Sequence, residues 1–177
     1  MDRFEIRFTG VGGQGIVLAS TILGHAAVID GLEAAQTSSY GAETRGTLTW
    51  GHVVISDKPV AYPMAISYDA LVALHQKGLN KELGLLKRNG ILLIDSDLVK
   101  EVPDGNYKLY KIPATKLALE NLGNKIFANM ILLGFLIGIT KIVSIKSAEL
   151  AVRENLRAMI DKNVEALRFG FNLFHTH

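Results

Sequence analysis

The stretch RFEIRFTGVGGQGIVLAS, residues 3–20, decides the fold class. Residues 3–8 alternate between charged and apolar side chains, which is the period of two that a β-strand shows. Four glycines follow between positions 10 and 15, and the chain then stays mostly apolar to Ile29, as a buried helix does. A strand, a glycine turn and a helix in this order open many α/β domains that contain parallel sheets.

Strands and helices continue to alternate in the rest of the chain. We predict strands at residues 32–37, 47–55, 70–74, 91–94 and 107–112, and helices at residues 79–86, 113–122 and 125–139. The pair Asn89-Gly90 is expected to end the first of these helices. Ser147 is expected to cap a C-terminal helical region whose apolar stripe extends to Phe171 and packs on this domain or on a partner.

The absence of a linker, a low-complexity tract or an internal repeat favours one domain over residues 1–177. The alternation of strands and helices predicts the α/β class. We expect a single three-layer α/β/α domain with a mostly parallel, Rossmann-like sheet.

Composition excludes several classes of protein. With 49% hydrophobic and 20% charged residues the chain is too apolar to be disordered, and a net charge of +2 without basic runs argues against a nucleic-acid partner. The sequence has no cysteine, which excludes a thiolate nucleophile, a disulfide and a cysteine-ligated cluster and fits a cytoplasmic protein. The most apolar stretch, residues 126–139, is shorter than the ~20 residues that span a bilayer, and the N-terminus lacks the apolar region of a signal peptide. We therefore expect no membrane partner.

The glycine turn, residues 10–15, carries the pattern G-x-G-x-x-G between a strand and a helix. Glycine permits positive φ and close approach of the backbone, and the free N–H groups at the start of a helix suit an anion. The predicted ligand-facing residues are Gly12, Gly13, Gln14 and Gly15. The alternative is a tight turn that binds nothing.

A dinucleotide site needs one more residue, an acid at the end of the second strand, ~20 residues further on, that holds a ribose. Gln36-Thr37-Ser38 stand at that place, and Glu33 lies nearer the beginning of the strand. This weakens a nicotinamide site. A stand-alone dinucleotide- or phosphate-binding Rossmann-like module remains the alternative function.

The polar loop, residues 38–46 with the sequence SSYGAETRG, is the second candidate site. It follows the second predicted strand, at the edge of the sheet where ligands usually bind. Arg45 can grip a phosphate or a carboxylate in fork geometry, Glu43 brings the opposite charge, and Tyr40 can anchor an interface. The alternative is a solvated loop with a weak local ion pair.

Other polar residues have simpler interpretations. A structural role is predicted for three histidines that lack a partner at metal-ligand spacing, His25, His52 and His75. Asp95 and Asp97 follow a buried strand and either form a site or cap the next element. Tyr68 precedes a strand, which is the wrong end for an active site in a parallel sheet. Asn129 lies in an apolar helix, where a buried amide needs hydrogen-bond partners.

The glycine turn and the polar loop together resemble a known family. GVGGQGIV at residues 10–17, followed by YGAETRG at residues 40–46, is similar to the gamma subunit, or gamma domain, of 2-oxoacid:ferredoxin oxidoreductases. Pro63, Asp69 and residues 129–134 resemble later landmarks of that family. Many relatives have two glycines after the loop arginine and an arginine in the next strand, whereas this chain has Gly46-Thr47 and then His52.

The resemblance implies a subunit that is inactive on its own. The complex would decarboxylate a 2-oxoacid, join the acyl group to coenzyme A and reduce ferredoxin, using thiamine diphosphate, Mg²⁺ and [4Fe-4S] clusters. The expected partners are alpha, beta and ferredoxin-like subunits, which would hold these cofactors. This chain would hold none of them, would supply no catalytic or metal-binding residue, and could form a homodimer when isolated.

The resemblance also places the candidate residues of both motifs near coenzyme A or the subunit interface. These residues are Gly12, Gly13, Gln14, Gly15, Tyr40, Glu43 and Arg45. The 2-oxoacid could be 2-oxoglutarate, pyruvate, a branched-chain 2-oxoacid or indolepyruvate, and we prefer 2-oxoglutarate.

Overall fold

Six strands form one sheet in the described part of the chain, which comprises residues 3–39, 46–60 and 66–174 of a computed structural model. The strands are β1 (Phe4–Val11), β2 (Glu33–Ser38), β3 (Leu48–Ser56), β4 (Tyr68–Ala73), β5 (Leu86–Asp95) and β6 (Tyr107–Ile112). Their order across the sheet is β2-β3-β1-β4-β5-β6. β3 runs antiparallel to both of its neighbours, whereas β1, β4, β5 and β6 pair in parallel. The prediction of a mostly parallel sheet is confirmed.

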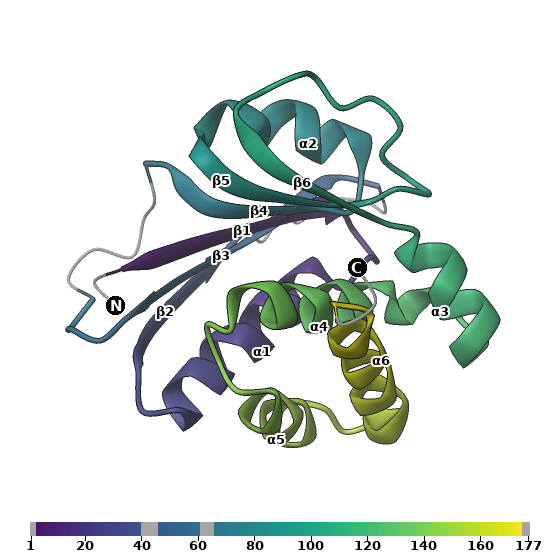
Figure 1. Ribbon diagram of the computed structural model, residues 1–177. Helices are drawn as coiled ribbons and strands as arrows, with labels where there is room; N and C mark the ends of the chain where they lie inside the picture. The colour runs from purple at the N-terminus through teal and green to yellow at the C-terminus, as the bar shows by residue number, and fades with distance from the viewer. Residues whose placement is uncertain (1–2, 40–45, 61–65, 175–177) are drawn as a thin grey trace.

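Helices cover both faces of this sheet. They are α1 (Ile16–Ile29), α2 (Gln76–Glu82), α3 (Ala114–Leu122), α4 (Ala128–Thr140), α5 (Ile145–Asn155) and α6 (Ile160–Leu173), with 3-10 turns η1 (Leu83–Leu85) and η2 (Lys125–Phe127). α1 and α4 lie against one face with α5 and α6 outside them, and α2 lies on the opposite face (Figure 1). The three layers are thus present, but one helical layer is much thicker than the other.

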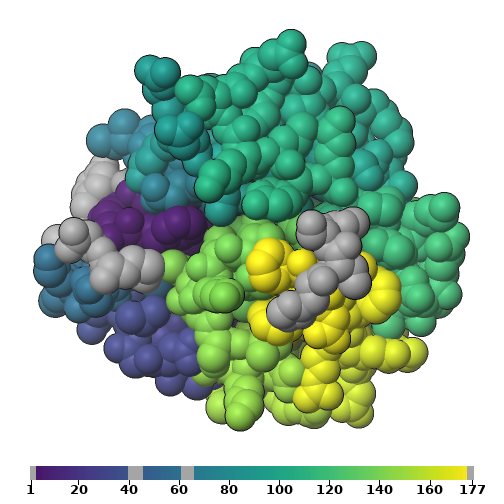
Figure 2. All heavy atoms as spheres, in the orientation of Figure 1, coloured from purple at the N-terminus to yellow at the C-terminus, as the bar shows by residue number. Residues whose placement is uncertain are grey.

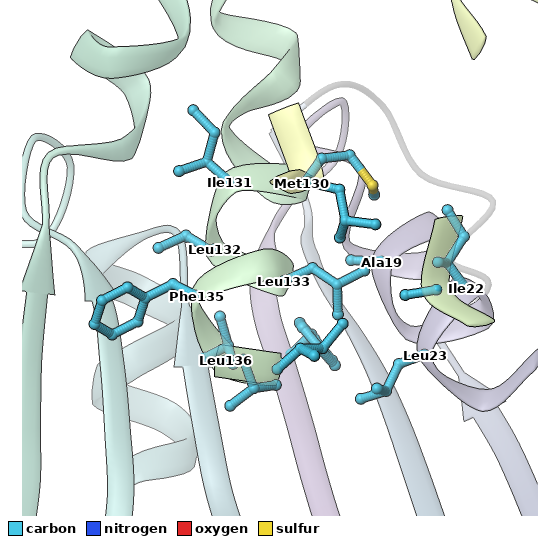
Figure 3. Packing of buried hydrophobic residues seen from close by; sticks show 14 of the residues in the cluster. Ala19, Ile22, Leu23, Met130, Ile131, Leu132, Leu133, Phe135 and Leu136 are labelled. Carbon is cyan, nitrogen blue, oxygen red and sulfur yellow. The ribbon is translucent and has the colours of Figure 1, made fainter. Parts of the chain in front are cut away.

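The main core lies between the sheet and the pair α1 and α4. Figure 3 shows side chains of α1, among them Ile22 and Leu23, meeting side chains of α4 such as Leu133 and Leu136. α4 is apolar on every side and is buried from Ala128 to Gly138, as expected of a helix enclosed by protein. In the described residues no helix combines the length and the apolar character that crossing a membrane requires.

α4 and α6 pack at very close range because each carries a glycine at the contact. A Cβ atom on Gly134 would overlap the carbonyl of Leu167, and one on Gly170 would overlap the carbonyl of Ile131. Figure 2 shows the yellow C-terminal segment packed directly against the yellow-green residues that precede it. The C-terminal helical region therefore packs on this domain.

The prediction that Asn89-Gly90 ends a helix was wrong. α2 ends at Glu82, and β5 already begins at Leu86, so both residues lie inside the strand. Asn89 takes a φ of 61°, and its N–H donates to the carbonyl of Asn106 at 2.7 Å. Pairing of β5 with β6 therefore outweighs the local turn propensity of the pair.

The predicted N-cap at Ser147 was also wrong, because Ser144 occupies that position. The Ser144 hydroxyl accepts from the N–H of Ser147 at 3.1 Å, which satisfies a free donor of the first turn of α5. The apolar stripe belongs to two helices rather than one. α5 ends at Asn155 and α6 begins at Ile160, and Met159 between them takes a φ of 53°.

Candidate functional site

The glycine turn lies where the chain connections of the sheet diverge. β1 leads into α1 on one face, and its parallel neighbour β4 leads into α2 on the other face (Figure 1). A crevice therefore opens at the carboxyl ends of these two strands, the usual ligand site of an open α/β sheet. This crevice contains a pocket of about 350 Å³. The residues that line the pocket include Val11, Gly12, Gly13, Gln14, Leu74, Leu98, Thr115, Lys125 and Ile126.

A second hollow of about 390 Å³ lies on the other side of the turn. It is bordered by the turn, by the first residues of α1 and by Thr49 of β3. The backbone of the glycine turn thus forms a wall between two open spaces.

Two glycines of the turn take conformations that side chains rarely adopt. Gly13 has a φ of 92° and Gly15 a φ of 70°. The N–H of Gly12 donates to the carbonyl of Thr47 at 2.9 Å. The N–H groups of Gly13 and Gly15 have no acceptor among the described residues. The turn therefore presents free donors at the start of a helix, where negative charge is favoured.

Gln14 braces the crevice. Its Oε1 accepts from the N–H of Val11 at 2.8 Å, and its Nε2 donates to the carbonyl of Leu74 at 2.8 Å. Both ends of the amide are thus engaged by backbone groups, one on the β1 side and one at the end of β4. The side chain of Gln14 forms part of the pocket wall, and its main contribution is to hold the two strand ends together.

The end of the polar loop, at Gly46, lies beside the glycine turn. Tyr40, Glu43 and Arg45 lie outside the described residues, so their predicted role stays a prediction. The residues that follow them are described: Thr47 accepts the hydrogen bond from Gly12, and a Cβ atom on Gly12 would lie 3.8 Å from the N atom of Gly46. The end of the polar loop therefore lies against the middle of the glycine turn.

Asp95 and Asp97 cap α3. Asp95 is fully buried, and its Oδ2 accepts from the Thr115 hydroxyl at 2.6 Å and from the Thr115 N–H at 3.1 Å. Asp97 accepts from the N–H of Lys116 at 2.7 Å. Burial raises the pKa of the Asp95 carboxyl, while the hydroxyl of Thr115 opposes that shift. Of the two interpretations, the structure supports capping, but the capped element is α3 and not β6, the element that comes next in the chain.

The strand order argues against a dinucleotide site. In the usual site the acidic residue stands at the end of a strand that neighbours β1. Here β3 separates β2 from β1, so the end of β2 lies two strand spacings, ~9–10 Å, from β1. Gln36 in β2 donates through its amide to the hydroxyl of Ser20 at 3.1 Å. Neither the position of β2 in the sheet nor the side chain of Gln36 suits the binding of a ribose.

A charged cluster lies on the face of the sheet that α2 covers. It could not be inferred from sequence motifs. The Nη2 of Arg7 donates to the Tyr68 hydroxyl at 2.7 Å, and that hydroxyl donates to Glu82 at 2.7 Å. Burial, reinforced by the hydrogen bond to Glu82, raises the pKa of Tyr68 to about 12. The one signal was the alternation of charged residues in β1, which places Glu5 and Arg7 on one face.

His52 lies in the same cluster and is 1% exposed. Its Nε2 is 3.5 Å from a carboxylate oxygen of Glu5. Burial, followed by the positive charges of Arg7 and Arg3, lowers the pKa of His52 to about 4. The described residues contain no group of three or more histidine and acidic side chains that could hold a metal ion.

Comparison with known proteins gives matches over nearly the whole chain. The profile of the pyruvate ferredoxin/flavodoxin oxidoreductase family matches residues 5–173. The 2-oxoglutarate synthase subunit KorC of Methanocaldococcus jannaschii is 42% identical over 175 residues, which are 97% of this chain and 94% of that protein. The pyruvate synthase subunit PorC of Methanothermobacter marburgensis is 35% identical over 171 residues, covering 94% and 95% of the two chains.

A solved structure shows the same fold. The gamma subunit of a keto/oxoacid ferredoxin oxidoreductase from Geobacter sulfurreducens superposes with a TM-score of 0.89 at 40% identity. The match covers 99% of this chain and 98% of that one.

Proposed function

Because the chain belongs to the gamma subunits of the 2-oxoacid:ferredoxin oxidoreductases, we propose that it works in a complex that decarboxylates 2-oxoglutarate, transfers the acyl group to coenzyme A and reduces ferredoxin. The choice of substrate rests on the relatives. Those named for 2-oxoglutarate reach 42% identity, whereas those named for pyruvate reach 35%.

The role of this subunit in the complex is to shape the coenzyme A site and to support its partners. The observation that carries this proposal is the glycine turn, because the N–H groups of Gly13 and Gly15 have no acceptor in the described part of the chain and stand between two hollows at the carboxyl edge of the sheet. A phosphate of coenzyme A fits such donors, and Lys125 at the pocket adds a positive charge. Arg45 would bind a second anionic group, with Tyr40 and Glu43 at the interface.

The cofactors of the complex belong to other subunits in this proposal. The sequence has no cysteine to ligate a [4Fe-4S] cluster. The described residues also lack a carboxylate cluster suited to the Mg²⁺ of thiamine diphosphate. Alpha, beta and ferredoxin-like subunits would therefore hold thiamine diphosphate, Mg²⁺ and the clusters.

The test is reconstitution of the complex by co-expression with the neighbouring genes. The complex should reduce a viologen dye only with a 2-oxoacid and coenzyme A, and kcat/KM should be highest for 2-oxoglutarate. A complex that works without this chain, or without coenzyme A, would refute the subunit role. Titration with NAD(H) or NADP(H) should show no saturable binding, and saturation would revive the dinucleotide alternative.

Two variants test the site itself. Gly13→Ala places a side chain at a φ of 92° beside the free donors, and we expect the KM for coenzyme A to rise by about tenfold or more. Gly84→Ala is the matched control, because a Cβ atom there meets nothing within 4 Å and the backbone φ is not positive. If both variants keep the wild-type KM for coenzyme A, the turn does not face this substrate.

A further inference from the structure

Asn129 makes a long-range contact with the glycine turn. It stands in the first turn of α4 and is 3% exposed. Its Nδ2 donates to the carbonyl of Gly15 at 3.1 Å, and its Oδ1 accepts from the N–H of Met130 at 2.8 Å. The buried amide is thus satisfied at both ends, and it stands 114 positions away from Gly15 in the chain.

Gly15 and Asn129 fit one another. A Cβ atom on Gly15 would overlap the Nδ2 and Cγ atoms of Asn129, so no larger residue can stand opposite this amide. The φ of 70° gives a second, independent reason for glycine at that position. The turn is therefore shaped to receive the side chain of Asn129 against its backbone.

The hydrogen bond fixes the orientation of one peptide unit. The carbonyl of Gly15 accepts from Asn129 and also from the N–H of Ala19 at 3.0 Å. In a trans peptide the carbonyl and the following N–H point in opposite directions. Two donors that hold the Gly15 carbonyl therefore direct the N–H of Ile16 away from the helix, toward the open side of the turn.

Ile16 borders the hollow between the turn and β3, together with Gly12, Gly13 and Gly15. Its N–H belongs to the first turn of α1, where donors have no partner within the helix. The direction of the Ile16 N–H decides whether it can donate to an anion bound by the N–H groups of Gly13 and Gly15.

We propose that Asn129 is a positioning residue for the reaction: by holding the Gly15 carbonyl, it aims the N–H of Ile16 at the phosphate of coenzyme A. The inference rests on the proposed function of the glycine turn. Asn129 itself does not touch the substrate, so its loss should weaken binding of coenzyme A and leave the chemistry unchanged.

The experiment uses the assembled complex and compares three variants. Asn129→Ala removes the donor, and Asn129→Asp removes it while keeping the volume of the side chain and placing negative charge beside the carbonyl. Asn163→Ala is the matched control, because Asn163 is also a buried amide that donates to a helix carbonyl, that of Met159 at 2.9 Å, away from the turn.

For Asn129→Ala the KM for coenzyme A should rise about tenfold, as expected for a lost hydrogen bond to an anion, with a larger rise for Asn129→Asp. The kcat at saturating coenzyme A and the KM for 2-oxoglutarate should stay within about twofold of wild type. Asn163→Ala should lower the Tm without changing the KM for coenzyme A.

The inference is overturned if Asn129→Asp, which keeps the packing even if Asn129→Ala does not assemble, shows a wild-type KM for coenzyme A. It is also overturned if Asn163→Ala raises that KM to the same extent. If Gly13→Ala raises the KM while the Asn129 variants do not, only the positioning role fails. A wild-type complex that shows no dependence on coenzyme A refutes the proposed function instead.

Discussion

The Nε2 of Gln14 lies 2.8 Å from the carbonyl oxygen of Leu74, and this hydrogen bond joins the turn after β1 to the end of β4. The two strands are parallel neighbours whose chains leave toward opposite faces of the sheet, and the N–H of Leu74 also donates to the carbonyl of Thr9 at 2.9 Å. The side chain of Gln14 thus extends the contact between the strands beyond their last backbone pair. The brace keeps the crevice at a defined width, with the free donors of the glycine turn on its wall.

Replacing Gln14 by glutamate should test this brace. The carboxylate keeps the acceptor for the N–H of Val11, but it has no donor for the Leu74 carbonyl and repels it. We expect the free energy of unfolding to fall by about 1–3 kcal/mol, measured by urea denaturation, and the KM for coenzyme A to rise. Gln76→Glu serves as the control, because Gln76 makes its hydrogen bonds at exposed positions. Equal stability of the two variants would contradict the brace.

His52 predicts a pH dependence of stability. Its pKa is about 4 in the folded protein and 6.5 in the unfolded chain. Between these values the unfolded state binds more protons, so the free energy of unfolding should fall as the pH drops from 6.5 toward 4. Urea denaturation across this range measures the slope. His52→Gln should flatten it, and His25→Gln serves as the control at a histidine whose side chain is 35% exposed.

The pair Arg7 and Glu82 should be strongly coupled. Their side chains are 12% and 7% exposed, and the Nε of Arg7 lies 3.4 Å from a carboxylate oxygen of Glu82. Arg7→Met leaves a buried carboxylate without its cation and should destabilise the protein by about 3–5 kcal/mol. Adding Glu82→Gln should recover part of that loss in a double-mutant cycle measured by urea denaturation. Additive effects of the two changes would show that the ion pair contributes no coupling.

The contact of α4 with α6 should tolerate no added methyl group. Gly170→Ala places a Cβ atom onto the carbonyl of Ile131, and both helices must separate to relieve the overlap. Overpacking of this kind should lower the free energy of unfolding by about 1–3 kcal/mol or more. Calorimetry should show a Tm several degrees below that of Gly84→Ala. A Tm equal to that control would mean that the helices move apart freely.

Much of the fold could be predicted because its signals are local. The helix expected from Ile16 to Ile29 has those bounds in the structure, and the apolar strand around residues 91–94 lies in β5, between β4 and β6. The glycines of the turn were expected to permit a positive φ, and Gly15 has one. Short periodic patterns of this kind report the conformation of the backbone directly.

The parts that escaped prediction depend on contacts between distant residues. Nothing local shows that β3 inserts between β1 and β2, because strand order follows from pairing across the sheet. The charged cluster joins Arg7 to Tyr68 and Glu82, which are 61 and 75 positions away in the chain. Asn129 could be recognised as a buried amide, but its partner Gly15 could not. The residues Tyr40, Glu43 and Arg45 remain predictions.

The encasement of α4 has a consequence for ligand binding. The helix that contacts the glycine turn through its first residues is buried along nearly its whole length, and α6 locks it from outside. The turn is therefore anchored to a helix that is enclosed by protein. The N–H donors are therefore in position before a ligand binds, and binding loses little affinity to reorganisation of this subunit. Any opening or closing of the site would then involve the surfaces that face the turn.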